Sequence, residues 1–269
     1  MRPPDGADPR LSLRADCAQC AGLCCVAPGF ARSADFAIDK PAGQACPNLA
    51  ADDFGCTIHS DLRKRGFPGC VVFDCFGAGQ QVVQEVFAGR EWRTDPALAT
   101  SMFAVFAVMR QLKELLWYLA ESLAKLPPGL LREEVERAQE DTRRLIDSPA
   151  PDLEALDAAE HRAQVGPLLG RVSQTLRAGV AQRGQDRIGA DLIGAKMAGA
   201  NLRGISLRGA YLLGADLRDT DMYCTDLLGA DLRGADLRGA QMTDSLFLTQ
   251  PQVDATHPDS TTRLPAILS

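Results

Sequence analysis

The middle of the chain carries hydrophobic residues at the spacing of an amphipathic helix. Its leucines recur at intervals of three and four residues: Leu112, Leu115, Leu116, Leu119, Leu123 and Leu126. Thr94-Asp95-Pro96 predicts the start of this helix, because aspartate caps a first turn and proline fits the first helical position. Pro127-Pro128 predicts its end, since proline donates no backbone hydrogen bond. We therefore expect one long helix between these two signals.

Shorter helical patterns follow the long one. They cover about residues 129–146, 152–165 and 168–180. Gly166-Pro167 is expected to break or kink the helix between the last two, because a proline inside a helix removes a backbone hydrogen bond. Residues 81–187 are therefore predicted to form a helical segment of three or four antiparallel pieces. His161 has charged neighbours in the sequence, and we interpret it as part of a solvent-exposed helix face.

From about residue 188 the pattern changes to a strict period of five. Successive pentads read Ala190-Asp-Leu192-Ile-Gly and Ala195-Lys-Met197-Ala-Gly, and the period fades at Phe247. Such a period fits neither a helix nor an ordinary strand and is typical of a solenoid. A Leu or Met at the centre of each pentad, with a small residue two places before it, indicates a narrow core of stacked side chains.

This segment resembles the pentapeptide-repeat family, whose consensus A-(D/N)-L-x-x it matches almost throughout. The resemblance implies a right-handed quadrilateral β-helix over residues 188–249, with four pentads in each coil and the central Leu or Met pointing inward. The pentads from Ala190 to Thr249 then make three coils. Cys224 falls at a corner of its pentad, and we interpret it as a plain corner residue. Some members of the family mimic duplex DNA and protect topoisomerases.

Residues twenty apart stack on the same outer face of such a solenoid. Ile193 would lie on Leu213 with Tyr211 beside them, and we expect this apolar ladder to be covered, because exposed apolar strips usually mark a contact. The covering element is predicted to be the last helix before the repeats, and this docking would make the helices and the solenoid one rigid unit. Residues 250–269 have no period, and we expect this tail to close an open end of the solenoid.

Eight of the nine cysteines lie before the helical segment. They are Cys17, Cys20, Cys24, Cys25, Cys46, Cys56, Cys70 and Cys75. The N-terminus lacks the apolar run of a signal peptide, and no segment has the apolar length of a membrane span, so we expect a cytoplasmic protein. Clustered cysteines in that compartment more often bind metal than form disulfides, and thiolates suit zinc or iron. Metal binding is therefore favoured over disulfides or free thiols.

The order of these cysteines resembles the YkgJ-type domain, a cysteine-rich family with a zinc- or iron-chelating role. Its pattern reads here as Cys17-x2-Cys20-x3-Cys24-Cys25, Cys46-Pro-Asn-Leu49, Cys56-Thr-Ile-His59 and Cys70-Val-Val-Phe73-Asp-Cys75. The resemblance covers residues 14–80 and implies that all eight cysteines hold zinc or iron, or an iron–sulfur cluster. Gly66-Phe67-Pro68-Gly69 departs from the pattern, where many members have Arg-Pro. Residues 1–13 are rich in Pro, Asp and Arg and are expected to be poorly ordered.

His59 follows Cys56 by three residues and is a second kind of possible ligand. With eight thiols available, we interpret it as packed or hydrogen-bonded and not as a ligand, although an imidazole can bind zinc. Phenylalanines between the cysteines are expected to form a small core around the site: Phe30, Phe36, Phe54, Phe67, Phe73 and Phe76. So small a core would fold poorly alone, so a metal would also act as a staple.

The charge of the chain limits its possible partners. A formal charge of −6 and a pI of 5.2 disfavour general binding to nucleic acid or membrane surfaces. The first hypothesis is a metal-binding protein whose solenoid is a platform for a protein partner. The alternative is an enzyme with an iron–sulfur centre for redox or group-transfer chemistry, although only His59 and Asp74 could act as a base near the thiols. A DNA mimic is least favoured, because three coils span roughly 15 Å against roughly 34 Å for a DNA turn.

Overall fold

The computed structural model describes residues 8–180 and 186–268. The chain folds as two units, Met1–Leu168 and Leu169–Ser269. Within the described residues, every helix is too short or too polar to cross a membrane.

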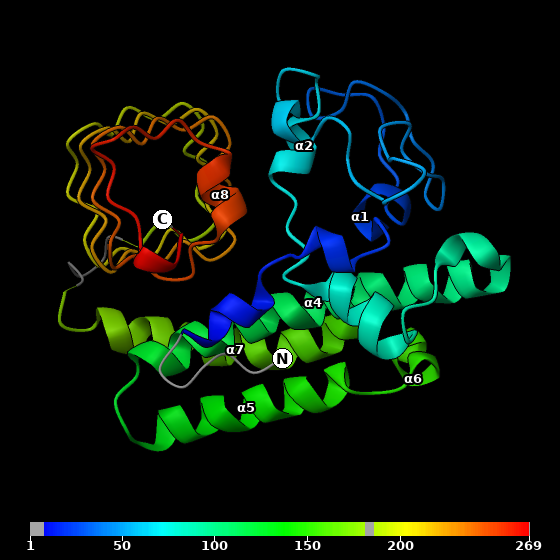
Figure 1. Ribbon diagram of the computed structural model, residues 1–269. Helices are drawn as coiled ribbons and strands as arrows, with labels where there is room; N and C mark the ends of the chain where they lie inside the picture. The colour runs from blue at the N-terminus through cyan, green and yellow to red at the C-terminus, as the bar shows by residue number, and fades with distance from the viewer. Residues whose placement is uncertain (1–7, 181–185, 269) are drawn as a thin grey trace. The chain divides into compact units, whose positions relative to one another are not determined.

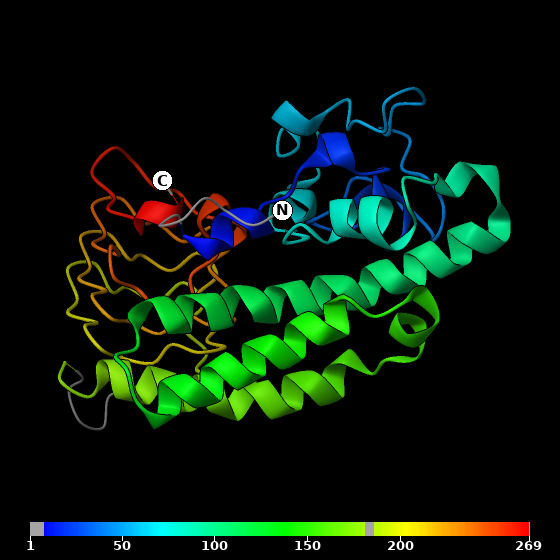
Figure 2. The same ribbon diagram turned by 60° about the horizontal axis from the view of Figure 1, so that its bottom comes forward.

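The first unit holds short helical turns around the cysteines and longer helices after them. The short ones are η1 (Pro9–Leu13), η2 (Cys17–Gln19), α1 (Leu23–Val26), η3 (His59–Asp61), α2 (Pro68–Val71), α3 (Ala78–Gln80), the π-helical η4 (Gln81–Val86) and η5 (Trp92–Thr94). The longer ones are α4 (Pro96–Lys125), α5 (Leu130–Ile146), α6 (Ala150–Ala155) and α7 (Ala158–Arg177), whose last turns belong to the second unit. Figures 1 and 2 show α4 and α5 side by side.

The helix α4 organises the first unit. It begins where predicted, because the Asp95 carboxylate accepts a hydrogen bond from the Ala97 backbone N–H at 2.8 Å. It ends at Lys125, just before Pro127-Pro128. Its inner face carries fully buried side chains: Met102, Val105, Met109, Leu112 and Leu119. The prediction of one long helix is confirmed.

The division between the third and fourth predicted helices is wrong. The break falls between α6 and α7, and α7 runs unbroken through Gly166-Pro167. A new helix begins there because the Asp157 carboxylate accepts the Ala159 N–H at 2.9 Å. Pro167 removes one backbone hydrogen bond, but buried neighbours on either side, Val165 and Leu168, hold the helix together.

His161 is buried, with 8% of its surface exposed, so the prediction of an exposed face is wrong. Its Nε2 lies 2.8 Å from the Thr142 hydroxyl, and that hydroxyl donates to the Ala138 carbonyl at 2.7 Å. The neutral imidazole must therefore donate from Nε2. Burial lowers the pKa of His161, and the charge of Asp141 acts against this. Charged sequence neighbours did not predict exposure, because adjacent residues of a helix point in different directions.

We expect the first unit to lose stability as the pH falls below about 6.5, the ordinary pKa of histidine. A histidine whose pKa is lowered in the folded state binds its proton more readily in the unfolded chain, so acid favours unfolding. One proton contributes a slope of at most about 1.4 kcal/mol per pH unit. Urea unfolding followed by tryptophan fluorescence isolates this unit, which holds Trp92 and Trp117, the two tryptophans of the chain. In the His161→Gln variant, the free energy of unfolding should depend less on pH. An unchanged slope against pH would contradict the role of His161.

The cysteine-rich residues are tied to the helices that follow them. The Trp92 indole donates to the Ala21 carbonyl at 2.8 Å. From α4, Arg110 donates to the Asp74 carbonyl, also at 2.8 Å. Residues 14–80, which we predicted as the cysteine-rich domain, lie with these helices in the first unit. The physical reason is size, since so short a segment buries too little apolar surface by itself.

The segment before the first cysteine is ordered from Asp8 onward, while residues 1–7 of the predicted disordered N-terminus lie outside the described residues. Arg10 and Leu13 of η1 are buried. The Arg10 guanidinium pairs with Glu121 at 3.1 Å and lies 5.4 Å from the centre of the Trp117 ring. The expectation of poor order fails for η1, because Arg10 meets a buried carboxylate on α4 that composition does not reveal.

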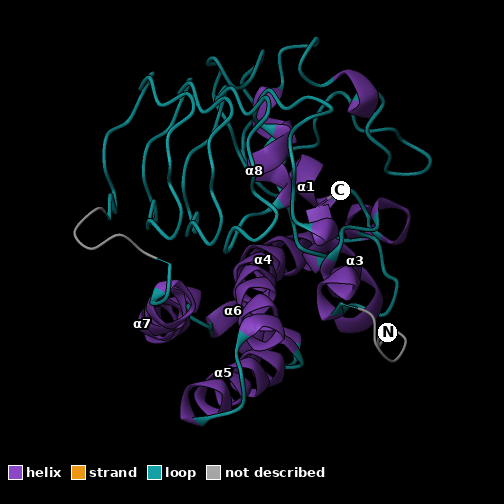
Figure 3. Cartoon of the chain, turned by 90° about the vertical axis from the view of Figure 1, so that its left-hand side faces the viewer, coloured by secondary structure: helices purple, strands orange, loops and turns teal. Residues whose placement is uncertain are grey.

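The second unit is a solenoid of stacked coils. Parallel bridges join residues twenty apart, such as Asp216 to Asp236 and Asn201 to Asp221. Each bridge is a single residue pair, so the coils are drawn as loops in Figure 3. Central Leu and Met residues fill the interior with no exposed surface: Leu207, Leu212, Leu217, Met222, Leu227 and Leu237. The pentad period therefore produces the stacked core that it predicted.

The tail of the chain covers one end of the solenoid. Its helix α8 (Gln250–Asp254) buries Val253, and η6 (Ala266–Leu268) buries Ile267 and Leu268. The tail also continues the stack, because His257 forms a parallel bridge with Asp236. This arrangement is the cap that a solenoid end requires.

The last turns of α7 contact the solenoid through a buried arginine. Arg177, with 5% of its surface exposed, donates to the Gly204 carbonyl at 2.7 Å and pairs with Asp186 at 2.8 Å. The Asp186 carboxylate in turn accepts the Ser206 backbone N–H at 2.7 Å. Desolvation acts to raise the pKa of Asp186, but hydrogen bonds from Arg177 and Ser206 outweigh it and lower the pKa. The predicted contact between the last helix and the repeats is therefore present within the second unit. The chain divides inside α7, however, so the prediction of one rigid unit of helices and solenoid is not met.

The face that this helix contacts is not the predicted one. Ile193 is 61% exposed and Tyr211 is 54% exposed, so the prediction that their ladder is covered is wrong. The helix lies instead along the face of Ser206, where Arg208 donates to the Leu169 carbonyl at 3.1 Å. Hydrogen bonds from arginine side chains to backbone carbonyls determine which face of the solenoid the helix contacts. The pattern of apolar residues does not reveal these bonds.

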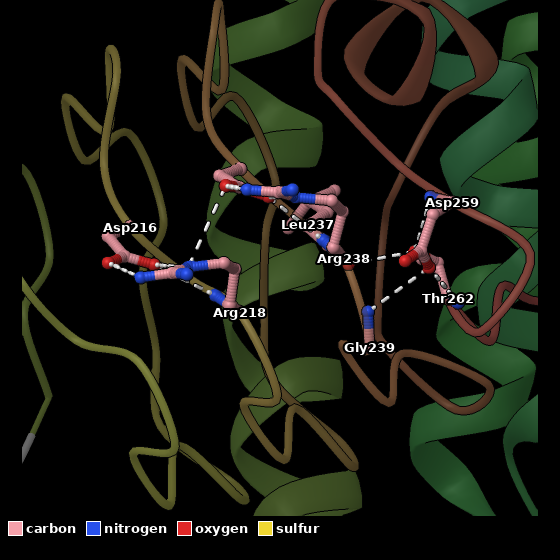
Figure 4. A network of polar contacts seen from close by, with 8 residues as sticks. Asp216, Arg218, Leu237, Arg238, Gly239, Asp259 and Thr262 are labelled. Carbon is pink, nitrogen blue, oxygen red and sulfur yellow. Dashed lines mark hydrogen bonds and ion pairs between the residues drawn. The ribbon is translucent and has the colours of Figure 1, made fainter.

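One outer face of the solenoid carries a ladder of aspartate and arginine. Asp216 and Arg218 form a two-point ion pair at 2.8 and 2.7 Å. Asp236 and Arg238 repeat it on the next coil at 2.9 and 2.6 Å. Arg218 also reaches Asp236 of the next coil, at 3.7 Å. Figure 4 shows Asp216, Arg218 and Arg238 on this face. Carboxylates and guanidinium groups therefore neutralise one another along this face.

We expect the double variant Arg218→Ala, Arg238→Ala to unfold almost like the parent. These pairs are open to water, where hydration and salt screening leave an ion pair little net stabilisation. Thermal unfolding followed by circular dichroism, at low and high salt, checks this expectation. The metal content of the variant should also equal that of the parent. A large loss of thermal stability or of bound metal would show that this face is coupled to the rest of the chain.

Candidate metal centre

One cavity of about 390 Å³ in the first unit is lined by every cysteine before the helical segment. The lining cysteines are Cys17, Cys20, Cys24, Cys25, Cys46, Cys56, Cys70 and Cys75. Cys224 lies in the other unit, where it occupies a solenoid corner at φ 54°, as predicted. The structure therefore brings together all eight residues that the sequence singled out for metal.

Two short turns place the first four thiols. Cys17 begins η2, and Cys20 directly follows it. Gly22 then turns the chain at φ 66°, where an added Cβ would lie only 2.6 Å from a leucine side chain. Cys24 and Cys25 follow on α1, and their sulfurs are 3.9 Å apart. These two thiols are therefore in contact with each other inside the cavity.

Backbone contacts hold Cys46 and Cys56 beside Cys25. The Cys46 N–H donates to the Cys25 carbonyl at 2.9 Å. Leu49 forms an antiparallel bridge with Cys56, so the chain returns past Cys46 before it continues. The Asn48 amide approaches the Cys46 sulfur at 3.7 Å.

The last two thiols come from the segment that leads into α3. Cys70 lies on α2. Cys75 precedes Gly77, which turns the chain into α3 at φ 77°. A Cβ at Gly79 would lie 2.6 Å from the Cys20 sulfur, so this glycine permits a close approach of the two segments. Cys75 and Cys20 consequently lie on the same side of the cavity.

Three of the thiols accept hydrogen bonds from backbone N–H groups. The donors are Gly22 and Leu23 for Cys20, Ile58 for Cys56, and Gly77, Ala78 and Gly79 for Cys75. Such hydrogen bonds favour the thiolate, which is the form that binds metal. They also resemble the contacts that tune the sulfurs of iron–sulfur centres.

Lys40 is a buried cation beside the thiols that sequence reasoning missed. It is 3% exposed, and its ammonium group donates at 3.1, 3.2 and 2.9 Å to three backbone carbonyls, those of Val26, Pro41 and Gln44. Burial lowers the pKa of Lys40, and neighbouring thiols act against this: Cys46, Cys25 and Cys70. A lysine between Asp39 and Pro41 carries no sign of burial in the sequence, so only the fold reveals this charge.

The thiols differ in how readily they ionise. Burial raises the pKa of Cys20 and of Cys70 to about 11. The hydrogen bond between Cys24 and Cys25 lowers the pKa of Cys25 to about 7, with help from the charge of Lys40. The same hydrogen bond, together with burial, raises the pKa of Cys24. Cys25 is therefore the most acidic of these four thiols.

The thiols surround a volume and do not converge on a point. Among residues 8–180 and 186–268, no group of three or more His, Cys, Asp or Glu side chains lies in position to hold one ion. The ligands of one zinc ion lie within roughly 4 Å of one another. Cys24 and Cys25, whose sulfurs are 3.9 Å apart, have this spacing. The eight thiols suit a thiophilic metal in their chemistry, but no three of the described side chains are placed to hold one ion.

Aromatic side chains form much of the cavity wall. Five of the six predicted phenylalanines line it: Phe30, Phe36, Phe54, Phe67 and Phe73. Phe30 and Phe36 stack with their ring centres 4.1 Å apart, whereas Phe76 packs against Trp117. His59 also lines the cavity but is exposed, so our interpretation of it as a packed side chain is not met.

Comparisons with known proteins identify the repeats. The family model for Pentapeptide repeats matches residues 188–222 and 214–247, with eight copies. The Uncharacterized protein YybG of Bacillus subtilis (strain 168) is 47% identical over 166 residues, which are 62% of this chain and 59% of that protein. This alignment is longer than the repeat region, so the similarity extends beyond the repeats, although it spans less than two thirds of the relative.

A solved structure was also found, the crystal structure of a Pentapeptide Repeat Protein (Rfr23) from the cyanobacterium Cyanothece 51142. It is 28% identical, has a TM-score of 0.22, and the match covers 28% of this chain and 54% of that one. With so low a TM-score, it is the family match that assigns the pentapeptide repeats.

Proposed function

We propose that this pentapeptide-repeat chain binds zinc or iron through its eight N-terminal cysteines. The gathering of all eight thiols around one cavity carries the proposal. Backbone N–H groups and the Lys40 ammonium supply positive charge or dipoles next to the sulfurs, as a thiolate site requires. The resemblance of the cysteine pattern to the YkgJ-type chelating domain supports the same assignment. When bound, the metal would act as a structural staple or, as an iron–sulfur cluster, carry electrons.

We further propose that the solenoid is a platform for a protein partner. Its exposed apolar residues offer contact area: Ile188, Ile193 and Tyr211. The paired ladder of Asp216 and Arg218 argues against a DNA mimic, because a mimic needs acidic groups that are not neutralised by neighbouring arginines. The repeats would then bring the metal centre to its partner.

Anaerobic purification, elemental analysis and an absorption spectrum test the metal proposal. Colourless protein with bound zinc supports a structural or binding role. Brown protein with iron and labile sulfide supports the alternative, an iron–sulfur-dependent redox or group-transfer enzyme. Protein that holds neither metal, even after anaerobic reconstitution with each, would overturn the proposal.

A further inference from the structure

We infer that the first coil of the solenoid, residues 186–205, binds the same coil of a second copy of this chain, end to end. The surface that this coil turns away from the rest of the stack is called the open end. The inference deepens the proposed role of the solenoid as a platform, since it names a second copy as a partner. It does not depend on metal.

The two ends of the solenoid differ in how well their cores are covered. At the far end, α8 and η6 close the stack. In the first coil, Leu192 and Met197 are only half-buried, although they occupy the central places of their pentads. One coil further, Leu212 and Leu217 occupy the same places with no exposed surface. The open end therefore leaves part of the core in contact with water, as a contact surface does.

The open end also presents backbone hydrogen-bonding groups. Within the stack, the Tyr211 N–H donates to the Ala190 carbonyl, and the Tyr211 carbonyl accepts the Leu192 N–H, both at 2.9 Å. Asp191 holds the place of Tyr211 one coil earlier, so its N–H and carbonyl face out of the end. Lys196 repeats this arrangement on the next side, because it bridges to the coil after it in the same way. Such an edge can pair with a further strand.

A second copy of the same end matches this edge. Two solenoids that meet end to end about a two-fold axis have antiparallel edges, in which opposite residues can exchange both backbone hydrogen bonds. Because the tail covers the far end, copies cannot stack head to tail into a filament. The contact between two open ends is therefore closed, and the product is a dimer.

Charge selects one register for this contact. A coil of twenty residues in pentads has four sides, and their exposed outer residues here are Asp186, Asp191, Lys196 and Asn201. A two-fold axis can pass through opposite sides or opposite corners, which gives four registers. With the axis at the corner between Asp191 and Lys196, each Asp191 faces Lys196 of the second copy. Asp186 then faces the Asn201 amide, which can donate a hydrogen bond to it.

The other three registers place like charges opposite each other. An axis through the side of Asp191 puts that carboxylate against its own copy. An axis through the side of Lys196 does the same for the ammonium group. The remaining corner axis puts Asp191 against Asp186. Like charges that face each other across an interface oppose association, so the register with Asp191 against Lys196 is favoured.

The favoured register also covers exposed apolar surface. Ile193 lies at the corner between Asp191 and Lys196 and is 61% exposed. The axis passes through this corner, so the Ile193 side chains of the two copies meet there. Their burial removes apolar surface from water in both copies and favours association.

Sedimentation velocity over a range of protein concentrations tests this contact in the full chain, with a reductant that prevents disulfides between copies. We expect the parent to dimerise reversibly. Asp191→Lys and Lys196→Asp should each raise the dissociation constant at least about tenfold, because like charges then meet twice. The double variant Asp191→Lys, Lys196→Asp restores opposite charges and should dimerise like the parent. Lys64→Asp is the control, since it changes the net charge equally at an exposed residue of the first unit.

Thermal unfolding followed by circular dichroism shows that each variant is folded, so that a loss of dimer reports on the contact itself. A parent that stays monomeric at every concentration overturns the inference but not the platform proposal, because a different protein can still bind the solenoid. A dimer that neither single variant weakens, or that the double variant does not restore, also overturns the inference, because the contact then lies elsewhere.

Discussion

Arg177→Met should destabilise the second unit by about 2–3 kcal/mol, because it leaves buried polar groups without their partner. The guanidinium holds the Gly204 carbonyl and the Asp186 carboxylate together, and Asp186 in turn holds the Ser206 N–H. Methionine keeps the bulk of the side chain but makes none of these bonds. Asp186 is partly open to water, which limits the loss to the lower part of the range for a broken buried pair.

Urea unfolding followed by circular dichroism measures this loss, with tryptophan fluorescence reporting the first unit separately. Arg187→Met is the matched control, because Arg187 is exposed and close in sequence to the same contact. The control should unfold like the parent. If Arg177→Met also unfolds like the parent, the buried arginine does not join helix and solenoid in the way that we describe.

Lys40→Met should lower the free energy of unfolding of the first unit by about 2 kcal/mol and reduce the amount of metal that it binds. The Lys40 ammonium group donates hydrogen bonds to three backbone carbonyls. Because the site is buried, little water can take over these hydrogen bonds when the ammonium group is removed. Two of the three carbonyls, those of Val26 and Pro41, also accept hydrogen bonds from backbone N–H groups. The Gln44 carbonyl is therefore the one most affected by the loss of the ammonium group. Methionine avoids the desolvation cost of the charge, which keeps the expected loss moderate.

Tryptophan fluorescence during urea unfolding, with elemental analysis of the folded protein, measures both effects. Lys64→Met is the control, since Lys64 lies in the same cysteine-rich segment with most of its side chain exposed. Unchanged stability together with unchanged metal content in Lys40→Met would show that the buried cation has neither role.

The periodic segments of this protein were predictable because the residues that repeat in the sequence are the residues that pack in the core. The pentads place Leu217 and Leu237 in one stack, and that stack is the core. The start of α4 was predictable for a local reason, since Asp95 caps the helix from within its own segment. In both cases the information lies within a few residues of the structure that it determines.

The remaining features depend on contacts between distant residues. Lys40 is buried because carbonyls at the end of α1 and in the loop after it accept hydrogen bonds from its ammonium group. Arg10 is ordered because Glu121 lies opposite it on α4. The eight cysteines could be selected by residue type and spacing. The shape of the cavity that they line could not be predicted, because its walls come from segments far apart in the sequence.

Because its coils repeat every twenty residues, a solenoid of this kind can change length only in whole coils without disturbing its faces. An insertion of five residues would turn every later face by one side and separate Arg218 from Asp236. The two ends of the solenoid cannot change in this way, because each makes contacts outside the regular stack. Arg177 and Asp186 occupy the first edge, and at the other end His257 pairs with Asp236 at an offset of 21, so the tail leaves the register of the repeats. In evolution, coils can therefore be gained or lost between the ends, while the ends themselves stay constant.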